Sequence, residues 1–308
     1  MEVTFIRDHM PVRHGFPRPD WNRIILGVEQ LAGDRRDDDT WQHETWAQIA
    51  RLWLEALREA LPNYVVKESP QFLLLVPADD RLGDTLLRWA EHYRRSVLQI
   101  LGDVGSEKGY GKHVLLAFDN REPFYSYICD FYPEEGEFAD AGGIFLNHGY
   151  GHIALWTTGQ FDLERTIAHE LTHNLLRHLP LPLWVNEGAT QYVSDSAVGS
   201  SSFVMSSELA RRHRAYWNQS TIDNFWSGES FTSPDDGQEL SYNLAEVLFR
   251  NLNGDFSYRV RDFIKSAKYS DAGEQALVDT CGVRLEDRVA QFLGPGPWKP
   301  RKDYGTEN

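Results

Sequence analysis

Residues 167–193, with the sequence IAHELTHNLLRHLPLPLWVNEGATQYV, constrain the fold of this 308-residue chain more than any other segment. Apolar residues recur at three- and four-residue steps before and after a Leu-Pro-Leu-Pro stretch at 179–182, as expected of amphipathic helices. Proline disfavours helical continuation, so the stretch ends the first helix. The segment therefore predicts helices over residues 162–177 and 183–193, with a short turn that returns the second alongside the first.

The first of these helices carries His169 and His173, four residues apart, and Glu170 between them. Side chains at i and i+4 lie on one helical face, so both imidazoles can bind one metal ion. Glu170 is turned by about 100° from His169, which places its carboxylate beside the metal rather than on it. Glu187 on the second helix can supply a third ligand, and three ligands with one open position are typical of catalytic zinc. The alternative is an ordinary helix whose histidines lie on its polar face, with Glu187 a surface charge.

Hydrophobic periodicity elsewhere predicts a sheet between groups of helices. We expect further helices over residues 21–31, 40–61, 82–101, 206–217, 240–251, 258–266, 273–278 and 286–293. We expect strands over residues 64–77 (interrupted at Pro70), 113–118, 125–132, 142–147 and 152–156. This order predicts an α+β fold. It suggests a helical extension over residues 1–62, a domain over 63–295 with a sheet-rich lobe (63–160) and a helical lobe (161–295), and a flexible tail over 296–308.

Net charge, cysteine content and the lack of long apolar runs limit what this protein can bind and where it can reside. The formal net charge of -15 argues against nucleic acid and anionic membranes, which both require basic surfaces. Cys129 and Cys281 are far apart and in no Cys-x-x-Cys pattern, so we expect neither a disulfide framework nor a thiolate zinc site. The sequence has no apolar run of about 18 residues and no signal-peptide pattern at its start. We therefore expect a cytoplasmic protein with no membrane partner.

The metal-ligand pattern resembles that of the gluzincins, the zincin metallopeptidases whose third ligand is a glutamate, and most closely that of the peptidase MA-like family. The shared motifs are His-Glu-x-x-His, a short proline-containing turn and Trp-x-x-Glu-Gly, within residues 140–195. The resemblance implies a zincin-like fold with a mixed sheet lobe, an active-site helix and a helical C-terminal lobe. It also implies one zinc ion on His169, His173 and Glu187, with Glu170 as the general base.

The resemblance also implies an oxyanion-stabilising tyrosine on a later helix. The sequence SYNLAEVLF makes Tyr242 its counterpart, since a phenol O–H near the metal can donate to the oxyanion of a tetrahedral intermediate. The alternative for Tyr242 is a packed helical tyrosine. Tyr192, Tyr216 and Tyr258 are rivals for the role.

In zincins, the strand before the active-site helix borders the substrate cleft, and residues 142–156 would supply it here. His148 and His152 lie four apart, about 13 Å along a strand, which is too far to share a metal. We expect both to line the cleft or the surface. No acidic residue lies in this segment to bind a substrate amino terminus, which favours an endopeptidase over an aminopeptidase.

The expected function is zinc-dependent hydrolysis of peptide bonds in a peptide or protein substrate. Two alternatives share the same metal chemistry or fold: a catalytically inactive peptide-binding protein, and a zinc hydrolase of a non-peptide amide. The sequence specifies neither the substrate nor the oligomeric state.

Overall fold

A computed structural model describes residues 3–132, 142–158, 162–201 and 203–305. Residues that pack together form two compact units. Among the described residues, unit 1 comprises 3–96, 107–132, 142–158 and 162–174, and unit 2 comprises 97–106, 175–201 and 203–305. This grouping does not test the predicted division into an extension, a metallopeptidase domain and a tail, which stays a prediction.

Unit 1 is built on a five-stranded mixed sheet with the order β3-β4-β5-β7-β6. The strands are β3 (Tyr64–Glu68), β4 (Phe72–Pro77), β5 (His113–Phe118), β6 (Gly143–Leu146) and β7 (His152–Trp156). The three central strands are parallel, while β3 and β6 pair antiparallel at the two ends. β4 and β5 are almost wholly buried, which explains why they read as continuous apolar runs rather than as alternating ones. These strands and the surrounding helices confirm the predicted α+β class.

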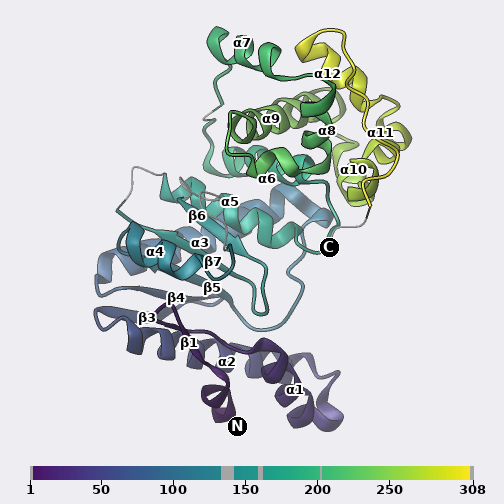
Figure 1. Cartoon of the computed structure of the whole chain (residues 1–308). Coiled ribbons are helices and arrows are strands. Elements are labelled where there is room, and N and C mark those ends of the chain that lie inside the picture. Colours follow the sequence, from purple (N-terminus) through teal and green to yellow (C-terminus); the bar gives the residue numbers. More distant parts are fainter. Residues whose placement is uncertain (1–2, 133–141, 159–161, 202, 306–308) are drawn as a thin grey trace. The chain divides into compact units, whose positions relative to one another are not determined.

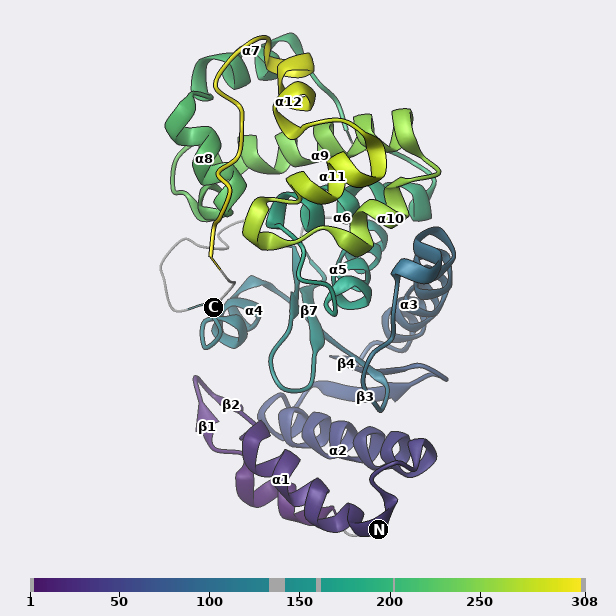
Figure 2. The same cartoon turned by 90° about the vertical axis from the view of Figure 1, so that its right-hand side faces the viewer.

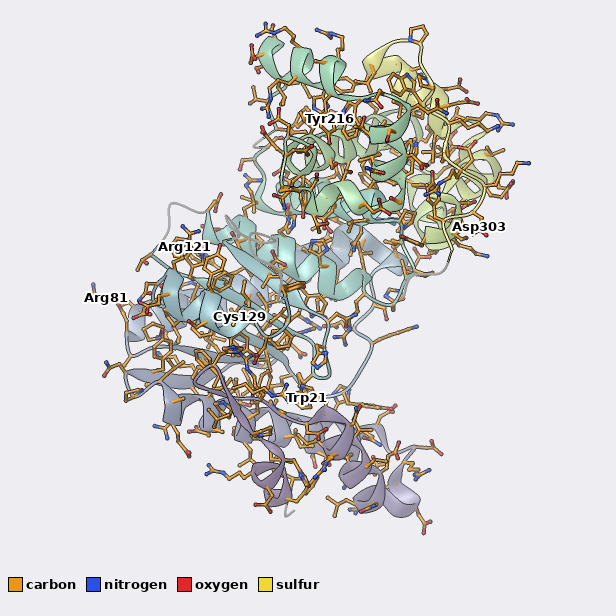
Figure 3. All side chains as sticks on the ribbon, viewed as in Figure 1. Trp21, Arg81, Arg121, Cys129, Tyr216 and Asp303 are labelled. Atoms are coloured by element: carbon orange, nitrogen blue, oxygen red, sulfur yellow. The ribbon has the colours of Figure 1, made fainter. Side chains whose placement is uncertain are left out.

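The helices of unit 1 flank this sheet. They are the 3-10 helices η1 (Thr4–His9) and η2 (Gly33–Arg35), and the α-helices α1 (Trp21–Ala32), α2 (Asp39–Ala60), α3 (Asp80–Leu101), α4 (Arg121–Ile128) and α5 (Leu163–Leu176), of which α3 and α5 continue into unit 2. Figure 1 shows α2 running along β3 and β4, which it contacts. Its N-cap is Asp38, whose side chain accepts from the backbone N–H of Trp41. Trp21, labelled in Figure 3, packs edge-on against Trp53 of α2 at 5.3 Å between ring centroids.

A buried arginine fixes an N-terminal arm to the rest of unit 1. The arm forms a hairpin of β1 (Val12–Arg13) and β2 (Phe16–Pro17), whose two turn residues both have positive φ, as a tight hairpin turn requires. Arg18 follows and is only 8% exposed. Its Nε lies 2.7 Å from a carboxylate oxygen of Asp130, and its guanidinium lies 4.2 Å from the ring centroid of Tyr127. The arm is thereby attached to α4 and the residues that follow it.

The predicted strand over residues 125–132 is wrong, because its first half belongs to α4. Asn120 caps the helix by accepting from the backbone N–H of Glu122, and this cap determines the local fold. Phe124, Tyr127 and Ile128 are buried at three- and four-residue spacing. The run of aromatic and β-branched residues favoured a strand, but the cap and the helical spacing outweigh that preference.

Unit 2 is helical. Its elements are η3 (Gly102–Val104), α6 (Leu183–Val198), α7 (Ser207–Tyr216), α8 (Gln219–Ser227), η4 (Glu229–Thr232), α9 (Gly237–Phe256), α10 (Val260–Ser266), η5 (Tyr269–Asp271), α11 (Glu274–Cys281) and α12 (Leu285–Leu293). Figures 1 and 2 both show α9 among the other helices of the unit. Trp184, Phe249 and Phe263 are among its fully buried side chains. In the segment predicted to be a flexible tail, Trp298 is 7% exposed and its carbonyl accepts from the Trp226 indole.

Two further observations concern the whole described chain. None of its helices is both long enough and apolar enough to cross a membrane. Cys129, at the end of α4 in Figure 3, and Cys281 both carry free thiols.

Candidate metal centre

The helix that carries both histidines begins and packs as its sequence predicts. The Asp162 carboxylate accepts from the backbone N–H of Arg165 at 3.2 Å, which caps the first turn of α5. One face of α5 is fully buried and consists of Ile167, Ala168, Leu171 and Leu175. The face carrying His169 and His173 is partly buried. Burial of the apolar face therefore fixes the direction in which the two imidazoles project.

The proline stretch separates α5 from a second helix, α6, which starts at Leu183 as predicted. Pro182 precedes α6, and its carbonyl accepts from the backbone N–H groups of Val185 and Asn186. Trp184 anchors the first turn, because it is fully buried and its indole donates to the Ala272 carbonyl at 2.9 Å. The helix extends to Val198, five residues beyond the predicted end, where Gly199 terminates it in the left-handed conformation.

Three of the predicted site residues come together on this helical pair. His169, His173 and Glu187 each offer one ligand atom, and the three atoms lie within 4.8 Å of one another. The two Nε2 atoms are 3.1 Å apart, and the ring centroids are 4.8 Å apart. At this distance one ring can donate its Nε2–H to the other. The same separation also lets both nitrogens face a single point.

The donor set fits a divalent metal of borderline softness. Two nitrogens each about 2.0–2.1 Å from a tetrahedral zinc ion lie about 3.3 Å from each other, close to the spacing of the histidine nitrogens. Two imidazoles and one carboxylate are ligands that zinc accepts, and other borderline divalent metals accept them too. The structure therefore supports a metal-binding group without selecting the metal.

Burial shifts the pKa values of two members of this group. Burial, reinforced by the neighbouring His173 and Arg165, lowers the pKa of His169 well below its usual value. The ring is therefore neutral near pH 7, the form in which a lone pair is available for a metal. Burial raises the pKa of Glu187 to about 8. A cation at this place would favour the ionised carboxylate instead, since an adjacent opposite charge stabilises it.

Glu170 lies beside His169 on α5 and is 6% exposed. It directly follows a histidine of the metal-binding group, which is the position expected for a general base in the His-Glu-x-x-His pattern. One turn further on, Asn174 is equally buried, and its amide nitrogen lies 2.9 Å from Nδ1 of His113 on β5. His113 in turn bonds to Glu107 at 2.8 Å, so this end of α5 is connected to the sheet of unit 1.

The tyrosines considered for oxyanion stabilisation lie in different surroundings. Tyr242 is on α9, 40% exposed, with its ring edge-on to Phe231 at 5.2 Å. The hydroxyl of Tyr192 accepts from the Asn253 amide, and that of Tyr216, at the end of α7 in Figure 3, donates to Asp235. Tyr258 is 77% exposed. The role of Tyr242 stays a prediction.

The interpretation of His152 as a cleft or surface residue is wrong. Its side chain is 2% exposed and packs on Trp53 at 4.9 Å. Both ring nitrogens are bonded, one to the Tyr127 hydroxyl and the other to the Tyr150 carbonyl, each at 2.8 Å. His152 is therefore a core histidine in a strand whose first four residues are buried. His148 is exposed at the surface, as expected.

Sequence reasoning missed two residues that fix the return helix, Gly188 and Arg250. The glycine directly follows Glu187 in the Trp-x-x-Glu-Gly motif, which was a local signal of close packing. Arg250 had no such signal, because its partners lie one turn away on its own helix and on a helix far away in sequence.

In comparisons with known proteins, no family model and no curated protein matches this chain.

Proposed function

We propose that this chain is a zinc-dependent hydrolase of peptide bonds, of the gluzincin type. The observation that carries the proposal is the convergence of His169, His173 and Glu187, whose ligand atoms lie within 4.8 Å of one another. Among the described residues the group consists of these three side chains. A structural zinc site usually has four protein ligands, commonly including cysteines, whereas a catalytic site keeps one position open.

In this proposal, His169, His173 and Glu187 hold the ion, and Glu170 moves the protons. The ion, when bound, supplies Lewis acidity that polarises the scissile carbonyl and makes a water molecule more acidic. The Glu170 carboxylate removes a proton from the attacking water. The same carboxyl then delivers this proton to the nitrogen of the leaving amine, so the acid and base steps balance.

The burial of Glu170 supports this assignment. Glu170 is 6% exposed and directly follows His169 on α5, so its side chain is buried next to a proposed metal ligand. In the same scheme the Tyr242 hydroxyl donates to the oxyanion that forms on the substrate carbonyl. Tyr242 is 40% exposed, so part of its side chain is in contact with solvent.

A metal and activity assay with a matched control tests the proposal. Purified protein is analysed for zinc and incubated with a peptide library whose cleavage is followed by mass spectrometry. Glu170→Gln should keep bound zinc and lose activity by a factor of about 10² to 10⁴, the usual contribution of a general base. Glu208→Gln, an exposed change on α7, should alter neither property.

The outcomes separate the alternatives. Protein that neither holds nor takes up zinc would refute the proposal. Zinc-loaded protein that binds library peptides without cutting them would indicate the inactive peptide-binding protein. Cleavage of non-peptide amides alone would indicate a zinc hydrolase of a non-peptide amide.

A further inference from the structure

The helix that carries Glu187 packs on α9 at unusually short range. A Cβ built on Gly188 would lie 2.5 Å from the Ala245 carbonyl oxygen and 2.8 Å from the Phe249 Cβ. Contacts that short do not occur between real Cβ atoms and backbone, so no larger residue fits without moving the helices apart. The glycine next to Glu187 therefore sets the separation between α6 and α9.

The contacts continue along the same face of α6. Tyr192, one turn after Gly188, packs on Phe249 at 5.8 Å, and its hydroxyl accepts from Asn253 at 2.7 Å. Moving one turn along α6, from Gly188 to Tyr192, thus moves the contacts on α9 about one turn further along the chain. The two helices therefore run in the same direction, and side chains at i, i+4 and i+7 of α6 form their interface.

A buried ion pair fixes the register of this interface two turns beyond Glu187. Arg250 of α9 binds Asp195 of α6, which is 4% exposed. Its Nε also donates to Glu246, one turn earlier on α9, at 2.8 Å. Asp195 additionally accepts from the Ser201 hydroxyl at 2.9 Å. A guanidinium bound to two carboxylates on two helices resists sliding, because any shift would leave a buried charge with poorer partners.

We infer that Arg250 is a positioning residue for the metal ligand Glu187. Gly188 fixes how far α6 lies from α9, and Arg250 fixes where it lies along α9. Glu187 is next to Gly188 on the same helix. The position of its carboxylate therefore depends both on the separation of α6 from α9 and on the position of α6 along α9. Zinc–ligand distances tolerate deviations of only about 0.2 Å, so a small shift of α6 weakens the site. This inference rests on the proposed function.

The experiment measures zinc affinity, by competition with a chromophoric chelator, on the full-length protein. Arg250→Met should weaken zinc binding about 10- to 100-fold, the usual effect of losing an orienting partner. Arg250→Lys should restore part of the loss, because it keeps the charge. The visible spectrum of the cobalt-substituted protein should also change in Arg250→Met, since it reports ligand geometry directly.

The matched control is Arg288→Met. Arg288 of α12 is 4% exposed and binds Asp255 of α9, so this change removes a buried arginine and an ion pair of α9 that does not involve α6. It should lower the melting temperature of the metal-free protein yet leave zinc affinity within about twofold. If Arg250→Met fails to fold, Asp195→Asn tests the same link from the other partner.

Three results overturn the inference: wild-type affinity in Arg250→Met, equal losses in Arg250→Met and Arg288→Met, or an unchanged cobalt spectrum. Each presupposes that the wild-type protein binds zinc. Failure of the wild-type protein to bind zinc would instead overturn the proposed function.

Discussion

His213, a buried histidine in unit 2, should make stability fall steeply in mild acid. Its side chain on α7 is fully buried, and its Nδ1 accepts the indole N–H of Trp217 at 2.9 Å. The Phe292 ring covers it edge-on at 5.1 Å. Protonation would place a hydrogen on Nδ1 and break the bond from Trp217, because a charged imidazole has no acceptor. The fold therefore selects the neutral ring.

The magnitude follows from the pKa. Burial, together with repulsion from Arg212 and against a smaller opposing effect of Glu239, lowers the pKa of His213 from 6.5 to about 4. Because the folded-state pKa is below the unfolded one, the unfolded chain binds the proton first as pH falls. The contribution of the neutral ring to the free energy of unfolding is fully present above pH 6.5 and is lost as pH falls towards 4. Each pKa unit corresponds to 1.36 kcal/mol, so by pH 4 the loss is about 3 kcal/mol.

The assay compares the wild-type protein with His213→Gln by denaturant unfolding between pH 7 and pH 4. Other titrating groups, including the buried His152, are common to both proteins and cancel in the difference. The free energy of unfolding of the wild type relative to the variant should fall by about 3 kcal/mol over this range. A relative stability that stays constant from pH 7 to pH 4 would refute the reasoning, as would a His213 pKa near 6.5 in an NMR titration.

Three further predictions concern the metal site and unit 1. Glu187→Gln should weaken zinc binding at least about 100-fold with an unchanged far-ultraviolet circular dichroism spectrum, because an amide is a poorer ligand than a carboxylate; tight binding by the variant would remove Glu187 from the site. Chelating the zinc should lower the melting temperature, and zinc at 100 times its Kd should raise the free energy of unfolding by about 2.7 kcal/mol. A melting temperature that is insensitive to zinc would contradict a site in the folded state. Burial would raise the pKa of Glu107, but bonds from His113 and Arg94 outweigh it and lower the pKa to about 2. Glu107→Gln should therefore cost about 1–2 kcal/mol at pH 7, after allowance for solvent screening, and the cost should shrink as pH falls from 4.5 towards 2; a cost independent of pH would point to packing alone.

Local signals account for most of what the sequence predicted correctly. The proline turn, the Asp162 cap and the apolar face of α5 all act within a few residues of the chain, so they predicted the two helices that carry the histidines and Glu187. The four confirmed strand segments, which correspond to the five strands β3 to β7, were readable for the same reason, as apolar runs bounded by turns.

The failures have tertiary causes. The aromatic run of α4 predicts a strand, whereas the Asn120 cap and burial at helical spacing make it a helix. The prediction for His152 fails because the residues that enclose it, Tyr127 and Trp53, lie far from it in the sequence. The link from Arg250 to Asp195 joins residues 55 apart, and such pairings depend on how helices pack rather than on local pattern.

The N-terminal arm has a practical consequence for fragments and fusions of this protein. A fragment starting at α1 would lack Arg18 and leave the Asp130 carboxylate, whose side chain is only 14% exposed, without its guanidinium. It would also uncover the ring of Tyr127 that the guanidinium covers. Expression designs should therefore keep the residues before α1, and an affinity tag is better placed so that the β1–β2 hairpin stays free to close against α4.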